Sequence, residues 1–402
     1  MADDADRRKP PHRERRAAPR PARPPRPPGE SGAARHFAQS YAEARDKFFV
    51  AARSRGLGVE THVHPLTGRD GEMLAMDVAR DGELAAPSLL VVSSACHGVE
   101  GFCGSGVQVA LLGDTGFHDE AAAAGVAVLY IHGLNPHGFS WWRRTTNENV
   151  DLNRNFRDFA AAPPANAHYE ELAALIVPET WPPDAATAAA LDAFVAEHGE
   201  RALQQAISGG QYAHPRGLFY GGNEPTWSHA TLRQVLHRHG ARCERLAWID
   251  LHTGLGPSGH GERIFACRDD ATALARAKRW WGDVTSFYDG SSTSAVLTGL
   301  MFNAAYEEAP QAEYTGIALE YGTLPQNEVT LALRADQWLE NHPDTDDATR
   351  AEIKRRLRDA FYVDSDEWKE KIVAQGVDAA RGALRGLGAP PTPAANDRRA
   401  AG

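Results

Sequence analysis

Four short and almost continuously apolar runs stand out along this 402-residue chain. A strand that is buried on both faces of a sheet shows this pattern, whereas a half-exposed strand alternates apolar and polar positions. We therefore predict buried strands at residues 88–93, 126–131, 247–251 and 316–320. The alternating segments 59–64 and 73–78 predict a hairpin that precedes them.

Apolar residues with helical spacing occupy much of the chain between these runs. In residues 37–53, Tyr41, Phe48 and Ala52 fall on related positions of one helical face. Further helices are predicted at 103–112, 185–207, 229–239, 270–281, 327–340 and 346–361. Strands that alternate with helices indicate an α/β fold. We expect a single domain with a mixed, mostly parallel central sheet flanked by helices on both faces.

Both ends of the chain differ in composition from the rest. Residues 1–35 are rich in Arg and Pro, and residues 386–402 are rich in Pro and Ala, with few large apolar side chains in either. Such segments bury too little apolar surface to offset their conformational entropy. We predict a disordered basic tail at 1–35, a folded domain at 36–385 and a second disordered tail at 386–402.

Charge and cysteine content narrow the class of protein. A net charge of -10 argues against nucleic acid as the main partner. The chain has no apolar run of about 18 residues, which a membrane span requires, and no apolar segment follows the basic N-terminus as in a signal peptide. The four cysteines form no paired motif. A soluble, cytoplasmic protein that binds neither membrane nor nucleic acid is expected.

The first candidate for chemistry is the pair His97 and Glu100, which follows the predicted strand 88–93. A catalytic zinc ion takes three nitrogen or oxygen ligands from the protein, and open α/β sheets bind ligands at the carboxyl ends of their strands. His252 ends another predicted strand and is the candidate third ligand. Cys96 is an alternative fourth ligand. Asp250 shares a strand face with His252, either as its hydrogen-bonding partner or simply as a polar strand end.

A His-x-x-Glu spacing is a weak signal by itself, and the chain contains a second one. His168 and Glu171 have the same spacing, but they lie in a predicted surface helix and not after a buried strand. We interpret this second pair as solvated side chains one helical turn apart. The choice between the two pairs needs a further motif.

That motif lies in the segment that follows the second buried strand. It contains Asn-Pro-His-Gly at 135–138, Trp-Arg-Arg at 142–144 and Asn-Val-Asp-Leu-Asn-Arg-Asn-Phe at 149–156. In this order the three motifs resemble the zinc carboxypeptidases, or funnelins, together with their murein-peptide and deacylase relatives. The resemblance is to an uncharacterised bacterial carboxypeptidase-like subfamily. It implies a zinc carboxypeptidase-like catalytic domain at 36–385.

The resemblance also assigns roles to individual residues. It implies one zinc ion held by His97, Glu100 and His252. It further implies that Asp151 orients a ligand histidine, and that Asn153 and Arg154 bind a free carboxylate of the substrate.

Two more roles follow from the same resemblance. Arg143 or Arg144 matches the arginine that stabilises the oxyanion, and the spacing favours Arg144 without deciding the register. Glu320, on the predicted strand 316–320, matches the general base. A buried carboxylate is costly unless it is functional or paired, which supports that role.

Three functions remain open at this point. The first is a metallocarboxypeptidase that acts on a small peptide. The second is a zinc amidohydrolase of the aspartoacylase or succinylglutamate desuccinylase type, acting on small N-acyl amino acids, and the third is a non-catalytic zinc-binding protein. An insert at 161–220 is not part of the pattern of the digestive enzymes, so the identity of the substrate stays open. The sequence does not determine the oligomeric state either.

Overall fold

The structure is a computed structural model that describes residues 32–389. All of these residues belong to one compact unit. Most of the predicted tails, at 1–35 and 386–402, lies outside the described residues. The predicted domain at 36–385 lies entirely within them.

An eight-stranded sheet forms the centre of the domain, with the strand order β1-β2-β4-β3-β5-β8-β6-β7. The strands are β1 (Val59–Thr67), β2 (Met73–Asp81), β3 (Ser88–Ser94), β4 (Val126–His132), β5 (Arg245–Ser258), β6 (Gly261–Phe265), β7 (Val284–Thr285) and β8 (Glu313–Gly322). Strand β3 is parallel to β4 and β5, and β5 is parallel to β8. The pairs β1–β2, β2–β4 and β6–β8 are antiparallel. The predicted α/β fold with a mixed sheet is confirmed.

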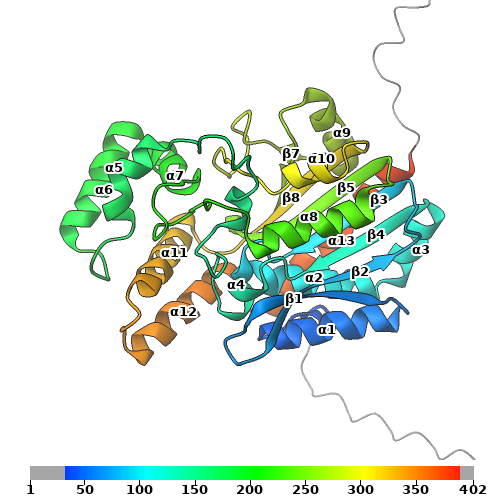
Figure 1. Ribbon diagram of the computed structural model, residues 1–402, viewed down its shortest axis with the longest axis horizontal. Coiled ribbons are helices and arrows are strands. Elements are labelled where there is room, and N and C mark those ends of the chain that lie inside the picture. The colour runs from blue at the N-terminus through cyan, green and yellow to red at the C-terminus, as the bar shows by residue number, and fades with distance from the viewer. Residues whose placement is uncertain (1–31, 390–402) are drawn as a thin grey trace, which may run out of the picture. The chain divides into compact units, whose positions relative to one another are not determined.

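Helices cover both faces of this sheet (Figure 1). On one face lie α1 (Tyr41–Ser54), α2 (Gly101–Gly113) and α13 (Asp366–Gly388), and α3 (Thr115–Ala123) packs beside them. In front of the sheet in Figure 1 lie α8 (Trp227–Gly240) and α10 (Asn303–Glu308). The remaining helices are α4 (Pro136–Ser140), α5 (Ala167–Ile176), α6 (Ala185–His198), α7 (Glu200–Ser208), α9 (Ala271–Trp281), α11 (Gln326–Asn341) and α12 (Asp347–Phe361).

Two helical predictions need correction. The single helix expected at 185–207 is two helices, α6 and α7, because Gly199 between them has φ 86° and ends α6. The sequence pattern also did not reveal α13, which packs against β3 and β5. Glycines replace large apolar residues where α13 meets its neighbours, and a Cβ on Gly386 would lie 2.2 Å from the Trp280 ring. The apolar pattern of α13 is therefore too weak to predict a helix from the sequence.

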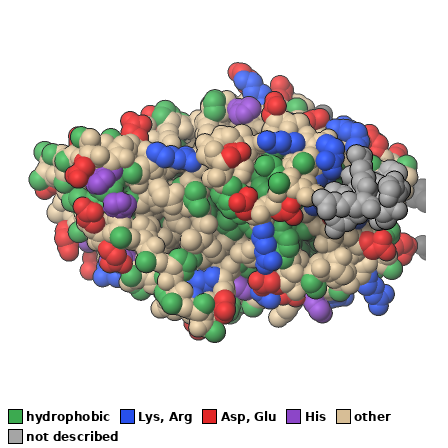
Figure 2. Space-filling view, turned by 90° about the horizontal axis from the view of Figure 1, so that it is seen from above, with side chains coloured by type: hydrophobic (Ala, Val, Ile, Leu, Met, Phe, Trp, Pro, Cys, Tyr) green, Lys and Arg blue, Asp and Glu red, His purple; other side chains and the backbone are tan. Residues whose placement is uncertain are grey.

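Most buried apolar side chains of the described residues form one large cluster around the sheet and a smaller one to the side of it. The smaller cluster joins α5, α6 and α7 to α11 and α12. A third group comprises Ala335, Leu339 and Ile353. Within residues 32–389, no helix is long and apolar enough to cross a membrane. On the face drawn in Figure 2, acidic and basic side chains of the described residues are interspersed.

Candidate metal centre

The His97–Glu100 segment forms a tight turn at the carboxyl end of β3. A short 3-10 turn, Gly98–Glu100, connects the strand to α2. A Cβ at Gly98 would lie 2.1 Å from the backbone carbon of Gly138, so only glycine allows this close approach. The backbone N–H groups of Gly98 and Val99 donate to the carbonyl oxygens of residues 144 and 143. The motif is therefore held in place by the segment that carries the candidate arginines.

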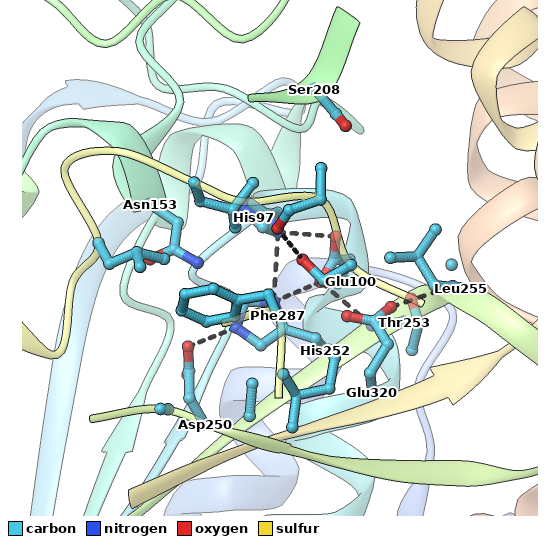
Figure 3. Close-up of a pocket in the computed structure, with 18 of the residues that line it drawn as sticks. His97, Glu100, Asn153, Ser208, Asp250, His252, Thr253, Leu255, Phe287 and Glu320 are labelled. Carbon is cyan, nitrogen blue, oxygen red and sulfur yellow. Dashed lines mark hydrogen bonds and ion pairs between the residues drawn. The ribbon is translucent and has the colours of Figure 1, made fainter. Parts of the chain in front are cut away.

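Three donor groups converge at this point (Figure 3). His97 Nδ1 lies 2.8 Å from Glu100 Oε1, and His252 Nδ1 lies 3.0 Å from Glu100 Oε2. The two Nδ1 atoms are 3.3 Å apart. Tetrahedral ligands about 2.1 Å from a zinc ion would lie about 3.4 Å from one another. The spacing of the donors in this structure is close to that value.

The register of the sheet brings the third donor beside the candidate base. His252 on β5 pairs directly with Glu320 on β8. Glu320 Oε1 accepts a hydrogen bond from the backbone N–H of Leu255 at 3.1 Å. Burial and the nearby charge of Glu100 raise the pKa of Glu320 to about 8. A carboxyl group with a raised pKa is suited to exchanging a proton near neutral pH.

Each histidine has a carboxylate behind it. His97 Nε2 lies 3.3 Å from Asp151 Oδ1, and His252 Nε2 lies 2.5 Å from Asp250 Oδ2. Asp250 also accepts a hydrogen bond from Ser93 Oγ at 2.6 Å. The carboxylate of Asp250 holds the far ring nitrogen of His252 as N–H, which leaves its Nδ1 free to bind a metal. The open question over Asp250 is answered by this contact with the ring of His252. At His97 a terminal nitrogen of Arg144 also lies 2.8 Å from Nε2. Because a guanidinium only donates, His97 Nε2 accepts this hydrogen bond.

The charges around the cluster favour a cation. Burial by itself raises the pKa of Glu100, but the charge of His97 and the hydrogen bond from His252 lower it overall. Burial also opposes ionisation of Asp151, yet Arg144 and Arg154 hold its pKa well below the usual range. Three carboxylates, Glu100, Asp151 and Asp250, surround the cluster against two guanidinium groups, Arg144 and Arg154. A donor set of two imidazoles and one carboxylate fits a zinc ion.

The two adjacent arginines point to different places. Arg144 lies against the cluster, with Nε 2.9 Å from Asp151 Oδ2 and a terminal nitrogen 3.2 Å from Glu100 Oε1. Arg143 turns away and bonds to Asp336 Oδ2 at 3.3 Å and to Asn149 Oδ1 at 2.9 Å. The structure therefore brings Arg144 to the site and leaves Arg143 in a buried ion pair.

Asn153 and Arg154 lie on the other side of the cluster. Asn153 Oδ1 accepts from the backbone N–H of Met301 at 2.9 Å. Arg154 is only 2% exposed, and it donates to the carbonyl oxygens of Asn153 at 2.9 Å and Ser208 at 2.6 Å. Its Nε has no hydrogen-bond partner among the described residues. A buried guanidinium with an unused donor can bind an anionic ligand by donating a hydrogen bond to it.

A cavity of about 150 Å³ contains these groups. Its wall away from the metal ligands is mainly apolar and is lined by Ile207, Phe219, Trp248, Phe287, Leu297 and Met301. The sequence did not single out Phe287, Leu297 and Met301, because apolar residues in loops carry no periodic signal that distinguishes a cavity wall from core. Figure 3 shows Phe287 and Ser208 among the residues that line this cavity together with His97 and His252.

The competing candidates are arranged differently. His168 and Glu171 are 50% and 62% exposed, and their closest charged atoms are 3.6 Å apart, as expected of a solvated pair on a helix. Cys96 forms a second group of potential ligands with Asp250 and His252. Burial raises the pKa of the Cys96 thiol well above its usual value, which disfavours the thiolate that binds metals.

Comparison of the sequence with known families gives one match. Residues 37–375 match the family described as "Protein of unknown function (DUF2817)". The chain belongs to this family. No curated protein matches the sequence. The metal-ligand cluster, Asp151, Arg154 and Glu320 all fall within the matched part of this DUF2817 chain.

Several solved structures are similar to the DUF2817 chain at low sequence identity. Bovine thrombin-activatable fibrinolysis inhibitor, in complex with tick carboxypeptidase inhibitor, is 12% identical with a TM-score of 0.47, covering 88% of this chain and 98% of that chain. Carboxypeptidase A from Helicoverpa armigera is 12% identical with a TM-score of 0.46, covering 87% and 73%. A Pseudomonas aeruginosa metallo-carboxypeptidase, in complex with (2-guanidinoethylmercapto)succinic acid, is 14% identical with a TM-score of 0.38, covering 85% and 71%. TM-scores below 0.5 are too low to assign a function to the DUF2817 chain.

Proposed function

We propose that this chain is a zinc-dependent hydrolase that cleaves an amide bond next to a free carboxylate, and that it is a metallocarboxypeptidase. The observation that carries the proposal is the convergence of His97 Nδ1, Glu100 and His252 Nδ1 within 3.3 Å of one another. Glu320 adds a buried carboxylate directly beside this cluster. A metal-storage site would need the three ligands but not the fourth acidic group.

One zinc ion is the proposed cofactor, with His97, Glu100 and His252 as its ligands. When bound, it supplies Lewis acidity at the scissile carbonyl and makes nearby water more acidic. Glu320 accepts a proton from that water and later delivers it to the leaving amine. The hydrogen bond from the Leu255 N–H orients the carboxylate of Glu320 for this transfer.

Arg144 and Arg154 act on different parts of the substrate. Arg144 carries a fixed positive charge beside the cluster and stabilises negative charge that develops on the carbonyl oxygen. Arg154 offers its unpartnered Nε, and Asn153 its side-chain amide, to the free carboxylate of the substrate. Holding that carboxylate fixes which amide bond faces Glu320.

A zinc amidohydrolase that acts on small N-acyl amino acids is the second candidate. The observation that favours it is the burial of the site, because His97, His252 and Glu320 are 4%, 3% and 8% exposed. A small substrate fits such a site more easily than the end of a folded protein. We also propose a reducing, cytoplasmic location, in keeping with four cysteines that are all buried free thiols.

The test is zinc analysis combined with a comparison of two substrate classes. The purified full chain should contain one zinc ion, and it should hydrolyse N-blocked dipeptides faster than N-acyl amino acids if it is a carboxypeptidase. The reverse order would favour the amidohydrolase. Bound zinc without hydrolysis of either class would show a non-catalytic zinc-binding protein, and the absence of zinc would reject all three functions.

A further inference from the structure

The insert at 161–220 spans the space between two walls of the proposed substrate site. On one side it is attached to α11, where Arg334 donates to the carbonyl oxygens of Ile176 at 2.8 Å and Leu175 at 2.9 Å. Trp338 Nε1 donates to the Glu179 carbonyl oxygen at 3.1 Å. In Figure 1, α5, α6 and α7 stand together beside α11. The insert and α11 also share the smaller apolar cluster.

On its other side the insert is attached to residues 292–298, here called the wall segment. Gln205 in α7 makes a reciprocal pair with Val296, in which its Nε2 donates to the Val296 carbonyl at 2.7 Å and its Oε1 accepts from the Val296 N–H at 2.9 Å. Arg201 donates to the Ser294 carbonyl at 2.7 Å, and Gln204 donates to that of Thr293 at 2.8 Å. The side chains of α7 thus form hydrogen bonds with backbone groups of the wall segment, in the place that a neighbouring strand would take.

These attachments bring the insert and the wall segment together at the cavity. Ile207 and Ser208 of the insert and Ala295 and Leu297 of the wall segment all line the cavity that contains His252. The cavity volume of about 150 Å³ equals that of an engineered apolar cavity that holds one benzene molecule. It can therefore take a group about as large as one apolar side chain.

We propose that the insert roofs the site into a chamber that admits only small amide substrates, with Arg201 and Gln205 as the residues that hold the roof closed. This inference rests on the proposed function and adds the size limit of the substrate. The chain then hydrolyses small amides, such as blocked dipeptides, and discriminates against the ends of long polypeptides.

The test compares two substrates that differ only in length. Zinc-loaded full-length protein is given N-acetylated peptides of two and eight residues that share the same last two residues, Ala-Leu. We expect kcat/KM for the dipeptide to exceed that for the octapeptide by about 100-fold, since discrimination is the ratio of these constants. If the two kcat/KM values differ by less than about threefold, or if the octapeptide is preferred, the proposal of a roof is wrong.

Variants of the roof should relax this discrimination. The double substitution Arg201→Ala with Gln205→Ala should raise kcat/KM for the octapeptide about tenfold while leaving that for the dipeptide within a few-fold. The matched control is Glu197→Ala in α6, whose side chain is 76% exposed on the same insert. An unchanged ratio in the double variant, or an equal change in the control, would contradict the assignment of these residues.

A second measurement does not depend on catalysis. Hydrogen exchange at the Val296 amide should be slow in the parent protein and faster in Gln205→Leu, which removes both the acceptor for the Val296 N–H and the donor to its carbonyl. This milder variant also serves if the double variant fails to fold. Unprotected exchange at Val296 in the parent would mean that the roof is not closed.

Binding separates failure of the roof from failure of the proposed function. If neither peptide is hydrolysed, the proposed function fails, and the chamber is tested by calorimetry with N-acetyl-leucine and the acetylated octapeptide. Tighter binding of the small ligand by about tenfold or more would support the chamber. Equal binding, or binding of neither ligand, would overturn it.

Discussion

His97 Nδ1 lies 3.3 Å from His252 Nδ1, and the carboxylate of Glu100 contacts both nitrogens. When neither ring nitrogen carries a proton, their lone pairs repel each other at this distance. A divalent cation bound by both nitrogens and the carboxylate removes that repulsion. The contact therefore ties the stability of the folded chain to metal binding, which gives the first prediction.

Zinc should stabilise the folded protein. At a free zinc concentration of about 100 times Kd, linkage predicts an increase of about 2.7 kcal/mol in the free energy of unfolding. Thermal unfolding with zinc and with a chelator measures it. His252→Ala should abolish the increase, whereas His168→Ala, on the exposed pair, should retain it. An equal response of both variants to zinc would reject the proposed ligand set.

Glu320→Gln should separate metal binding from catalysis. The amide has nearly the shape of the carboxylate and can still accept the hydrogen bond from Leu255, but it cannot take a proton. We expect zinc content and thermal stability to be retained and kcat to fall by about 100- to 10,000-fold. The control is Glu313→Gln at the start of the same strand, whose side chain is 38% exposed. Near-full activity of Glu320→Gln would exclude it as the base.

Arg143 and Arg144 should give opposite results. Arg144→Ala removes positive charge beside the cluster and should lower kcat/KM about 100- to 1,000-fold. Arg143→Ala breaks the buried pair with Asp336 and should instead lower the free energy of unfolding by about 2–3 kcal/mol, with kcat/KM of the folded protein little changed. Urea unfolding and steady-state kinetics on both variants measure this. A catalytic loss confined to Arg143→Ala would reverse the assignment.

Acid should destabilise the fold through His132. Its ring is fully buried against Phe48 and lies 2.9 Å from Ser105 Oγ, and burial lowers the pKa of His132 from 6.5 to about 4. Between these pH values the unfolded chain binds a proton that the folded chain does not, so stability falls as the pH falls. The total loss is about 3 kcal/mol.

The variant His132→Gln should remove this dependence. Its free energy of unfolding should change with pH less steeply than that of the parent by up to about 1.4 kcal/mol per pH unit between pH 6.5 and 4. Urea unfolding at several pH values measures the slope. His168→Gln, at a half-exposed position, should leave the parent slope unchanged. Parallel slopes for His132→Gln and the parent would contradict the buried neutral imidazole.

Local patterns predicted the elements that carry strong periodicity. The strands predicted at 88–93, 126–131, 247–251 and 316–320 are β3, β4, β5 and β8, and their starts agree within three residues. Their ends agree within two residues except for β5, which continues to Ser258. A buried strand needs apolar side chains on both faces, and this requirement is visible in the sequence alone. The break at Gly199 and helix α13 were not predicted, because a single glycine and small packing residues leave little trace in an apolar pattern.

The order of motifs along the chain determined which residues were candidates for the site: His97, Glu100, His252, Asp151, Arg154 and Glu320. It could not choose between Arg143 and Arg144, because adjacent residues share every sequence signal and differ only in the direction of their side chains. The register of β5 against β8 is what sets His252 beside Glu320. The hydrogen bond between Gln205 of α7 and Val296 likewise joins segments about 90 positions apart in the chain. The sequence by itself determined the chemistry available to this protein, whereas only the tertiary structure decided which groups meet and how much space they leave, because both depend on long-range packing.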